Sequence, residues 1–297
     1  MATAIAFRSV TKRFPDGTLG LADATWYVAE GAHACLLGSS GAGKTTAVRM
    51  LQAALRPTGG SVLLLGVQVD GPGYRDVRGR LGILPQGPGM YPDLTAGEYL
   101  ALAARLYGSR PDTAVEALDL TEYMRTRMTY LSPNFQRRLA LAAALVADPD
   151  VLVLDEPTAG LEPDDARDLQ PYLREAMRGR TAVLCTHNEQ EARALCQEVA
   201  ILRSGRVVAQ GTWDELWRRS RPRLRVAARQ GVERVLAELA EMGLHAEPED
   251  GAVLVSTADP QLEGATLLRR LLEAGLDVYE CAPVQPEVKD IVLEAFQ

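Results

Sequence analysis

Apolar and polar residues alternate in some parts of the chain and form unbroken runs in others, and this contrast predicts its elements. Residues 1–27 alternate around Pro15-Asp16-Gly17, which predicts antiparallel strands joined by a turn. Apolar runs without alternation occur at 34–37, 151–154 and 181–185. Such runs are typical of strands that are covered on both faces, as in a parallel sheet.

Helical signals separate these strands. Thr95 and Glu98 have the spacing of a capping box, and helix-spaced apolar residues follow them as far as residue 108. Another helix is predicted at about 133–147, so that residues 87–147 form a helical insert. Strands that alternate with helices predict an α/β fold with a mainly parallel sheet, whose strand carboxyl ends collect ligands.

The pattern changes near Gly211. The run 217–223, Trp-Arg-Arg-Ser-Arg-Pro-Arg, predicts a charged linker between a domain at 1–216 and a domain at 217–297. The second domain is predicted to be a small α+β domain, and its sequence shows no catalytic constellation. Its expected strands are 224–228, 253–256 and 277–281, and its expected helices are 232–242, 262–274 and a last one from about Pro286.

A glycine-rich segment carries the first chemistry. Residues Gly38-Ser39-Ser40-Gly41-Ala42-Gly43-Lys44-Thr45 form a complete phosphate-binding P-loop, directly after an apolar strand and before a helix that begins near Lys44. This order directs backbone N–H groups and a helix N-terminus at one anionic point. Lys44 adds a positive charge and Thr45 a hydroxyl for Mg²⁺, so the segment predicts binding of a nucleoside triphosphate. The turn and short strands expected after this helix are 56–60, 61–65 and 81–84.

Two carboxylates follow the apolar run at 151–154. Asp155, at the tip of a core strand, is placed to hold the Mg²⁺ that bridges the β- and γ-phosphates. Glu156 is expected to point elsewhere because strand side chains alternate, and it is placed to orient or deprotonate an attacking water. The P-loop core is therefore predicted to complete a nucleotide hydrolysis site.

Composition limits the possible partners. The chain has 297 residues, 47% of them hydrophobic, and a net charge of -7, which argues against a general nucleic-acid binder because phosphate-backbone affinity needs clustered Lys and Arg. The four cysteines lack a CxxC spacing and are expected to be reduced thiols in the cytosol. The longest apolar stretch, 139–147, is about half the length of a membrane span, so no direct span is predicted.

Over about residues 3–215, the sequence resembles the nucleotide-binding ATPases of ABC transporters. Beyond the P-loop and the two carboxylates, the resemblance rests on Gln86 after a strand, the stretch Ala-Gly-Leu-Glu-Pro at 159–163, and His187 after an apolar run. It implies a P-loop NTPase core with an antiparallel β subdomain and a helical insert, and ATP and Mg²⁺ as cofactors. Phe14 matches the aromatic that stacks on adenine in this family, with a simple strand-edge residue as the alternative.

The resemblance also implies roles for individual residues. Gln86 would sense the γ-phosphate and the metal, His187 would contact the γ-phosphate and support hydrolysis, and Glu156 would act on the water. The expected nucleotide-binding residues are Phe14, Gly38, Ser39, Ser40, Gly41, Ala42, Gly43, Lys44, Thr45, Thr46, Asp155 and Ser132, and the expected metal ligands are Thr45, Gln86 and Asp155.

One family motif departs from its usual form. The family signature, usually LSGGQ, reads Leu-Ser-Pro-Asn-Phe at 131–135. In the family this segment closes over the ATP bound by a second subunit, and glycines suit the close approach of backbone amides to phosphate. Pro133 has no N–H, and Asn134 and Phe135 are expected to add bulk there, although Ser132 remains as an N-cap. Glu162 also replaces the usual Asp.

The resemblance implies an export ATPase at the inner face of the cell membrane. Its partners would be a second ABC ATPase subunit and separately encoded, multi-span membrane subunits that dock on the helical insert. With a different partner that carries a normal signature, this P-loop site would hydrolyse ATP and the partner's site would turn over slowly, whereas a homodimer would have two impaired sites. An importer, and a regulatory ABC protein that acts as a nucleotide-controlled binding module, are the alternatives.

Overall fold

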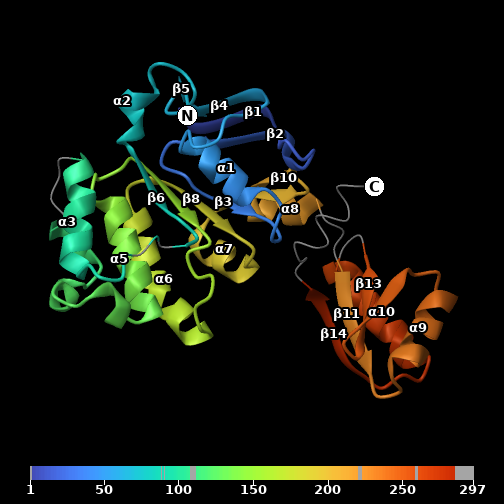
Figure 1. The fold of residues 1–297 in the computed structure, drawn as a ribbon. Helices are drawn as coiled ribbons and strands as arrows, with labels where there is room; N and C mark the ends of the chain where they lie inside the picture. Colours follow the sequence, from blue (N-terminus) through green and yellow to red (C-terminus); the bar gives the residue numbers. More distant parts are fainter. Residues whose placement is uncertain are drawn as a thin grey trace. The chain divides into compact units, whose positions relative to one another are not determined.

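The structure is a computed structural model that describes residues 2–87, 89, 91–107, 112–219, 223–257 and 260–284 (Figure 1). The chain forms two compact units, Met1–Gly211 and Thr212–Gln297, which divide a few residues before the boundary expected from the sequence. The first unit contains two sheets and the second unit one, and each unit has its own hydrophobic core.

An antiparallel sheet opens the first unit, with the order β2-β1-β4-β5. Strands β1 (Thr3–Arg13) and β2 (Leu19–Ala29) flank the turn expected at residues 15–17. Strand β4 (Gly59–Leu64) pairs with β1 and with β5 (Val67–Gln68). Residues 59 and 60, which were expected to belong to the turn at 56–60, are therefore the first residues of this strand. A Cβ on residue 60 would collide with the main chain of β1, and these glycines therefore serve strand pairing rather than the turn.

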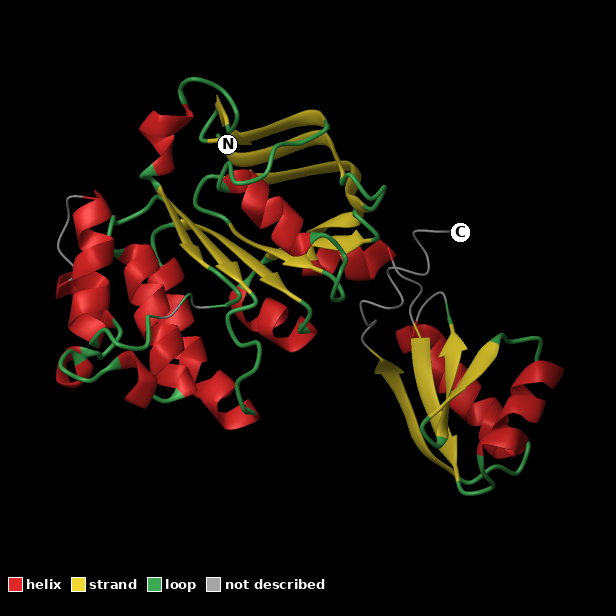
Figure 2. Cartoon of the chain, in the orientation of Figure 1, coloured by secondary structure: helices red, strands yellow, loops and turns green. Residues whose placement is uncertain are grey.

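A second sheet has the order β10-β9-β3-β8-β7-β6 and holds the apolar runs seen in the sequence (Figure 2). The neighbours β9, β3, β8, β7 and β6 pair in parallel, as expected from their lack of alternation. The strands are β3 (His33–Leu37), β6 (Leu81–Leu84), β7 (Val151–Asp155), β8 (Thr181–Thr186), β9 (Glu198–Arg203) and β10 (Arg206–Thr212).

Helices connect these strands and build the insert. The capping box is present: Thr95 N donates to Glu98 Oε2 (2.8 Å), and Glu98 N donates to Thr95 Oγ1 (3.2 Å), which fixes the start of α3. The helices are α1 (Lys44–Leu51), α2 (Tyr74–Arg78), α3 (Ala96–Tyr107), α4 (Asp112–Ala117), α5 (Pro133–Leu145), α6 (Pro163–Met177) and α7 (Glu189–Leu195), with 3₁₀ turns at Thr121–Tyr123 and Met128–Tyr130.

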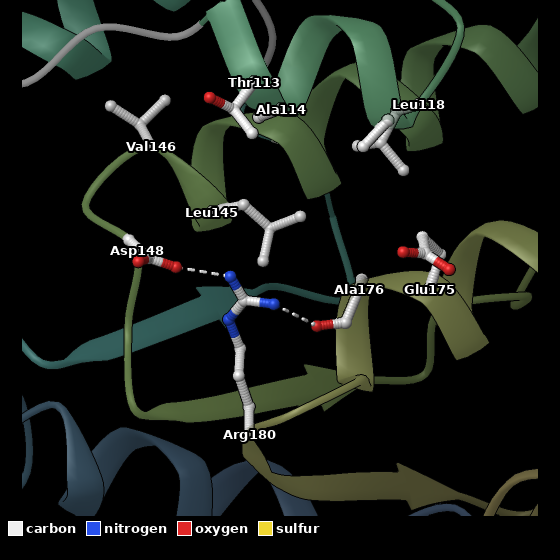
Figure 3. A pocket seen from close by; sticks show the side chains of 10 residues that line it. Thr113, Ala114, Leu118, Leu145, Val146, Asp148, Glu175, Ala176 and Arg180 are labelled. Carbon is white, nitrogen blue, oxygen red and sulfur yellow. Dashed lines mark hydrogen bonds and ion pairs between the residues drawn. The ribbon is translucent and has the colours of Figure 1, made fainter.

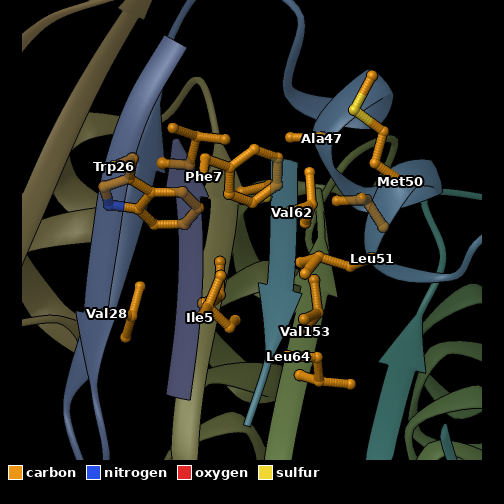
Figure 4. Close-up of a cluster of buried hydrophobic side chains, with 14 of the residues drawn as sticks. Ile5, Phe7, Trp26, Val28, Ala47, Met50, Leu51, Val62, Leu64 and Val153 are labelled. Carbon is orange, nitrogen blue, oxygen red and sulfur yellow. The ribbon is translucent and has the colours of Figure 1, made fainter. Parts of the chain in front are cut away.

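The core of the first unit holds α1 between the two sheets (Figure 4). Apolar side chains of β1, β2 and β4 face one side of α1, and those of β7 and β8 face the other. Phe7 and Trp26 form an aromatic pair in this core, with ring centroids 5.8 Å apart. Because α1 begins at the last residues of the P-loop, this packing fixes the direction of the predicted phosphate site.

The second unit has the chain order β-α-β-β-α-β, the ferredoxin-like arrangement. Its antiparallel sheet, β12-β13-β11-β14, carries one strand that the sequence did not predict, β12. That strand reads Ala-Glu-Pro-Glu and pairs only with β13, and polar residues with a proline are typical of such an edge. The elements are β11 (Arg223–Ala228), α9 (Val232–Glu241), β12 (Ala246–Glu249), β13 (Ala252–Ser256), α10 (Pro260–Glu273) and β14 (Val278–Val284).

The charged linker expected at 217–223 was wrong for residues 217–219 and 223, and residues 220–222 lie outside the described part of the chain. Residues 217–219 end a helix, α8 (Trp213–Arg219), and Arg223 begins β11. Helix α8 starts with a capping box that was not predicted, in which Thr212 N donates to Glu215 Oε2 (2.9 Å). The last helix expected from Pro286 lies outside the described residues.

Three of the four cysteines, Cys35, Cys185 and Cys196, are buried, and burial raises the pKa of their thiols. That the thiols are reduced in the cytosol stays a prediction. Within the described ranges, no helix is long and apolar enough to span a bilayer.

Candidate functional site

The P-loop connects β3 to α1 and is held from several directions. Gly38 N donates to Thr186 O of the neighbouring strand (3.1 Å), and Gly205 N donates to Ala42 O (2.9 Å). Gly43 has φ 114°, and a Cβ there would collide with the carbonyl oxygen of Gly20. Among the described residues, no side chain caps the N-terminus of α1. The first N–H groups of this helix can therefore bind a ligand.

Lys44 lies at the centre of the site and is almost fully buried. Its Nζ donates to Gly38 O (2.6 Å) and Ser39 O (3.0 Å), and forms an ion pair with Glu156 Oε1 (3.0 Å). An ammonium group has three protons, and these three acceptors match them. Lys44 therefore joins the P-loop directly to the carboxylate that follows β7.

Glu156 also contacts a residue that follows the neighbouring strand β8. Its Oε2 lies 2.8 Å from Nδ1 of His187, which follows β8. The Glu156 side chain is buried whereas 60% of the His187 side chain is exposed, so the histidine can reach a ligand beyond the carboxylate. The structure thus brings together Lys44, Glu156 and His187, which are far apart in the sequence.

The orientation of Glu156 has a different cause from the one expected. Strand β7 ends at Asp155, and Glu156 has φ 49°, in the left-handed region. Glu156 N donates to Cys185 O (2.8 Å), which holds this turn against β8. The two carboxylates therefore diverge because the chain turns after the strand, not because strand side chains alternate. Such backbone conformations in non-glycine residues recur at functional sites.

Asp155 and Thr45 form the candidate Mg²⁺ site. Asp155 is buried beside the Thr45 hydroxyl, and burial raises its pKa, whereas the hydrogen bond from Thr45 and the charge of Lys44 lower it. Asp155 Oδ1 is buried without a hydrogen-bond partner in the described part of the chain. A buried, unpaired carboxylate oxygen next to a hydroxyl fits a Mg²⁺ ion, which uses one or two protein oxygens together with phosphate oxygens and water.

Gln86 reaches the same edge of the sheet through strand register. Leu84 of β6 pairs with Leu154 of β7. Gln86 and Glu156 each follow their paired leucine by two residues, so both lie at the same edge of the sheet. The side chain of Gln86 is exposed, and its carbonyl oxygen accepts a hydrogen bond from Arg137 Nη1 (2.7 Å). Its predicted part in metal binding stays a prediction.

Phe14 lies beside the first turn of α1. It follows β1 and is partly buried, and Gly20 leaves room for its ring: a Cβ on Gly20 would lie 2.7 Å from Phe14 Cε2 and 3.0 Å from Thr46 Oγ1. Lys12 Nζ is 5.6 Å from the centroid of the ring. The ring therefore borders the P-loop helix at Thr46, which is where an adenine-stacking residue is expected; stacking itself stays a prediction.

The altered signature begins α5, in a different part of the unit. Ser132 is the N-cap, with its Oγ accepting from Phe135 N (3.4 Å), and Pro133 takes the first helical position, as expected. Asn134 is buried, with Nδ2 donating to Asp165 O (2.8 Å). Phe135 is partly buried, and its ring packs on Tyr123 at a centroid distance of 3.9 Å. The bulk expected from these two side chains stays a prediction.

A hollow on the far side of the insert contains no predicted site residue (Figure 3). It has a volume of about 290 Å³ and lies between α4, α5 and α6. Arg180 closes one side by donating to Asp148 and to Ala176 O (3.2 Å). We assign it no function.

Two buried polar residues near the site were missed in the sequence. Arg137 contacts the segments that carry Gln86 and Ala159, and Glu191 accepts from Thr186 Oγ1 (2.6 Å). A helix-interior Arg and a first-turn Glu carry no distinguishing sequence signal. Their roles follow only from where α5 and α7 place them.

Comparisons with known proteins agree with this geometry. The family described as ABC transporter matches residues 21–159. The chain is 39% identical over 215 residues to Nod factor export ATP-binding protein I of Burkholderia pseudomallei, covering 70% of each chain. It is 32% identical to Daunorubicin resistance ATP-binding protein DrrA3 of Streptomyces coeruleorubidus, covering 98% of this chain and 95% of that protein.

The chain belongs to the ABC transporter family. It is an ATP-binding ATPase of the ABC type, with the P-loop core that its sequence predicted.

Solved ABC structures share the fold. CbiO1 from Clostridium perfringens, part of an ABC transporter complex, superposes with a TM-score of 0.66 and 25% identity, covering 74% of this chain and 92% of that one. A bacterial Atm1-family ABC exporter with ATP bound gives a TM-score of 0.63 at 28% identity, covering 72% of this chain and 39% of that one. These likenesses concern the ABC ATPase domain, which is here the first unit.

Proposed function

We propose that this ABC ATPase hydrolyses ATP at its own P-loop to power an exporter whose membrane subunits are separate chains. The observation that carries the catalytic part is the shared carboxylate of Glu156, which contacts both Lys44 and His187. The export part rests on relatives named for Nod factor export and daunorubicin resistance, the second of which matches nearly the whole chain.

The contacts of Lys44 suggest how ATP prepares the site. The ammonium group of Lys44 is paired with Glu156 Oε1 in this structure. Phosphate oxygens that enter the P-loop would compete with Glu156 for this group. Loss of that contact leaves a buried carboxylate with a free oxygen, which can accept a proton from the attacking water. His187, mostly exposed, keeps Glu156 oriented through Nδ1, which leaves Nε2 as the ring nitrogen that would contact the γ-phosphate.

Mg²⁺ would be held by Thr45 and Asp155, with Gln86 as the third candidate ligand. When bound, it neutralises charge on the β- and γ-phosphate oxygens. The unpaired Oδ1 of Asp155 is the feature of this chain that supports the assignment.

The start of α5, which would close over a partner's ATP, has few free backbone N–H groups to donate to phosphate. Of the first three N–H groups of α5, Pro133 lacks one, and Phe135 N already donates to Ser132 Oγ. Asn134 N remains as a donor for phosphate. A signature with two glycines would supply more donors and allow closer approach, so we infer that this surface binds the partner's γ-phosphate weakly.

We therefore propose an asymmetric pair of ATPase subunits. This chain's P-loop site, closed by the normal signature of a different subunit, turns over, and the partner's site, closed by Ser132 and Pro133, turns over slowly. Steady-state ATPase rates of the purified chain alone and of the native complex test this, with Glu156→Gln as the inactive control. Fast turnover by a homodimer of this chain would sink the proposal.

Apolar side chains on the insert support a membrane partner. Leu102, Leu106 and Tyr107 of α3 are exposed, and 78% of Leu106 is accessible. Exposed apolar patches of this kind mark interaction surfaces. We propose that membrane subunits dock there and hold the ATPase at the inner face of the membrane.

Purification of the native complex with its subunits identified tests the transport role. We expect a multi-span membrane protein and a second ABC ATPase. Isolation as a soluble protein that binds ATP with little turnover would instead support the regulatory binding module. The direction of transport is tested by reconstituting the complex in vesicles, where export predicts movement away from the ATPase side and import the reverse.

A further inference from the structure

Arg137 is a buried arginine that joins three segments of the first unit. It lies in the second turn of α5, and only 6% of it is exposed. Its Nη1 donates to Gln86 O (2.7 Å) and Pro85 O (3.3 Å), in the segment after β6, and its Nη2 donates to Ala159 O (3.0 Å), in the loop between β7 and α6. One side chain thus holds both segments that flank the hydrolysis site.

The charge of Arg137 is buried against three carbonyl oxygens. Burial lowers the pKa of Arg137, and the negative charge of Glu191 opposes that effect. A planar guanidinium presents its donors in a rigid fork, so three carbonyl oxygens fix the distance between the two segments. A lysine has neither the reach nor the fork to make all three contacts at once.

The β7–α6 loop is also held from the opposite side. Glu191, buried at the start of α7, is hydrogen-bonded to Thr158 and to Thr186 Oγ1, the latter at 2.6 Å. Thr186 precedes His187 in the chain. The loop that begins with Glu156 is therefore set between Arg137 on one side and the histidine segment on the other.

We propose that Arg137 is a positioning residue for ATP hydrolysis, acting through the backbone of Gln86 and Ala159. It does not touch nucleotide. It holds Gln86 at the metal edge of the site and keeps the β7–α6 loop in register with it. This inference rests on the proposed cis site and concerns only this chain's own P-loop.

The chain offers a matched control in the next residue. Arg138 is also buried in α5 and also donates to carbonyl oxygens, those of Leu118 and Asp119, but it makes none of the contacts with Gln86 or Ala159. Arg137→Met and Arg138→Met remove the same charge from the same helix. Arg137→Lys retains the charge without the fork.

Two measurements on the full chain separate positioning from folding. The first is the ATPase rate in the native complex, resolved into kcat and KM. The second is the Mg²⁺ concentration that gives half of the ATP-induced rise in Tm of the purified chain, and it does not depend on turnover. If no assembly of the wild type hydrolyses ATP, the proposed function fails, and the Mg²⁺ titration still tests the role of Arg137.

We expect both Arg137 variants to lower kcat about 10- to 100-fold, with KM for ATP within about twofold of the wild type, as is typical when a residue that orients a ligand is lost. The Mg²⁺ requirement rises by a similar factor. Arg138→Met lowers Tm and leaves kcat and the Mg²⁺ requirement unchanged.

A double mutant tests the route through Gln86. If Arg137 acts by holding Gln86, then Arg137→Met adds little to the loss already caused by Gln86→Ala, because the two changes share one pathway. The proposal is overturned if Arg137→Met keeps the wild-type kcat and Mg²⁺ requirement while folded, if Arg138→Met reproduces its effects, or if the double mutant is fully additive.

Discussion

At the scale of single residues, the first unit places one cation and one histidine ring against a single buried carboxylate. Glu156 lies between the ammonium of Lys44 and the imidazole of His187, each within 3.0 Å. A buried charge is tolerated only when it is paired, and these partners come from the P-loop and from the segment after β8. This arrangement supports the proposal that hydrolysis depends on Glu156.

Glu156→Gln is expected to lower kcat by about 100-fold or more, because an amide cannot accept the proton of the attacking water. ATP binding should persist, since the P-loop, Thr45 and Asp155 are unchanged. Phosphate release and titration with a fluorescent ATP analogue measure the two effects. Lys44→Ala is the contrasting control, for which binding itself should fail.

Asp155→Asn is expected to stabilise the chain without nucleotide. Because burial raises the pKa of Asp155 above its ordinary value of 3.8, the folded state holds the proton where the unfolded state has released it. Stability is therefore lost as the pH rises through the folded-state pKa, and an uncharged Asn escapes that loss.

We expect the Tm of Asp155→Asn to exceed that of the wild type at pH 8, and to exceed it by less at pH 5. The same variant should lose the Mg²⁺-dependent part of its stabilisation by ATP. Thermal unfolding at both pH values measures this. An equal Tm difference at pH 5 and pH 8 would contradict the assigned cause.

At the scale of elements, local sequence signals set where helices and buried strands form. Contacts with distant segments set the edge strand β12 and the backbone turn at Glu156. The capping box at Thr95 begins a helix, and the buried apolar runs at 34–37, 151–154 and 181–185 each form a parallel strand. These features were readable because they depend on neighbours in the sequence. The polar edge strand β12 and the positive φ of Glu156 were not readable, because pairing with other segments creates them.

Thr95→Ala is expected to lower the free energy of unfolding by about 1 kcal/mol, since it removes the two hydrogen bonds of the Thr95 hydroxyl and leaves only the bond from Thr95 N to Glu98. The helix that it starts lies in the insert, away from the P-loop. ATP affinity should therefore stay unchanged. Urea unfolding and an ATP titration on the same preparation check the two parts, and a large loss of ATP affinity would contradict them.

Restoring glycines to α5 tests the signature directly. The double change Pro133→Gly and Asn134→Gly returns an N–H group and removes the bond from Asn134 to Asp165 O. We expect a stability loss of about 1–2 kcal/mol and a faster ATPase rate in any assembly where this α5 closes an ATP site. Asn134→Ala is the control, which should carry the stability loss without the gain in rate.

At the scale of the whole molecule, two units with separate cores share one chain. The first contains every residue of the candidate ATP site, and the second is a ferredoxin-like domain with its own buried cluster. The sequence showed that a second α+β domain was present. It did not give its topology, because β12 carries no apolar alternation.

Ligand binding should therefore act on one unit alone. Calorimetry of the full chain is expected to show two unfolding transitions. Mg²⁺ and ATP should raise the Tm of only one of them, because ATP at 100 times its Kd adds about 2.7 kcal/mol to the free energy of unfolding of the unit that binds it. Lys44→Ala should abolish that shift and leave the other transition in place. A single transition that moves as a whole would show instead that the units unfold together.

The central claim is that this chain's own P-loop site hydrolyses ATP while its altered signature closes a slow site on a different partner. The most direct measurement is the steady-state ATPase rate of the native complex with Glu156→Gln in this chain, compared with the corresponding substitution in its partner ATPase. The account predicts that Glu156→Gln removes nearly all turnover and that the partner substitution removes little. Turnover that survives Glu156→Gln, or equal losses from both substitutions, would contradict it.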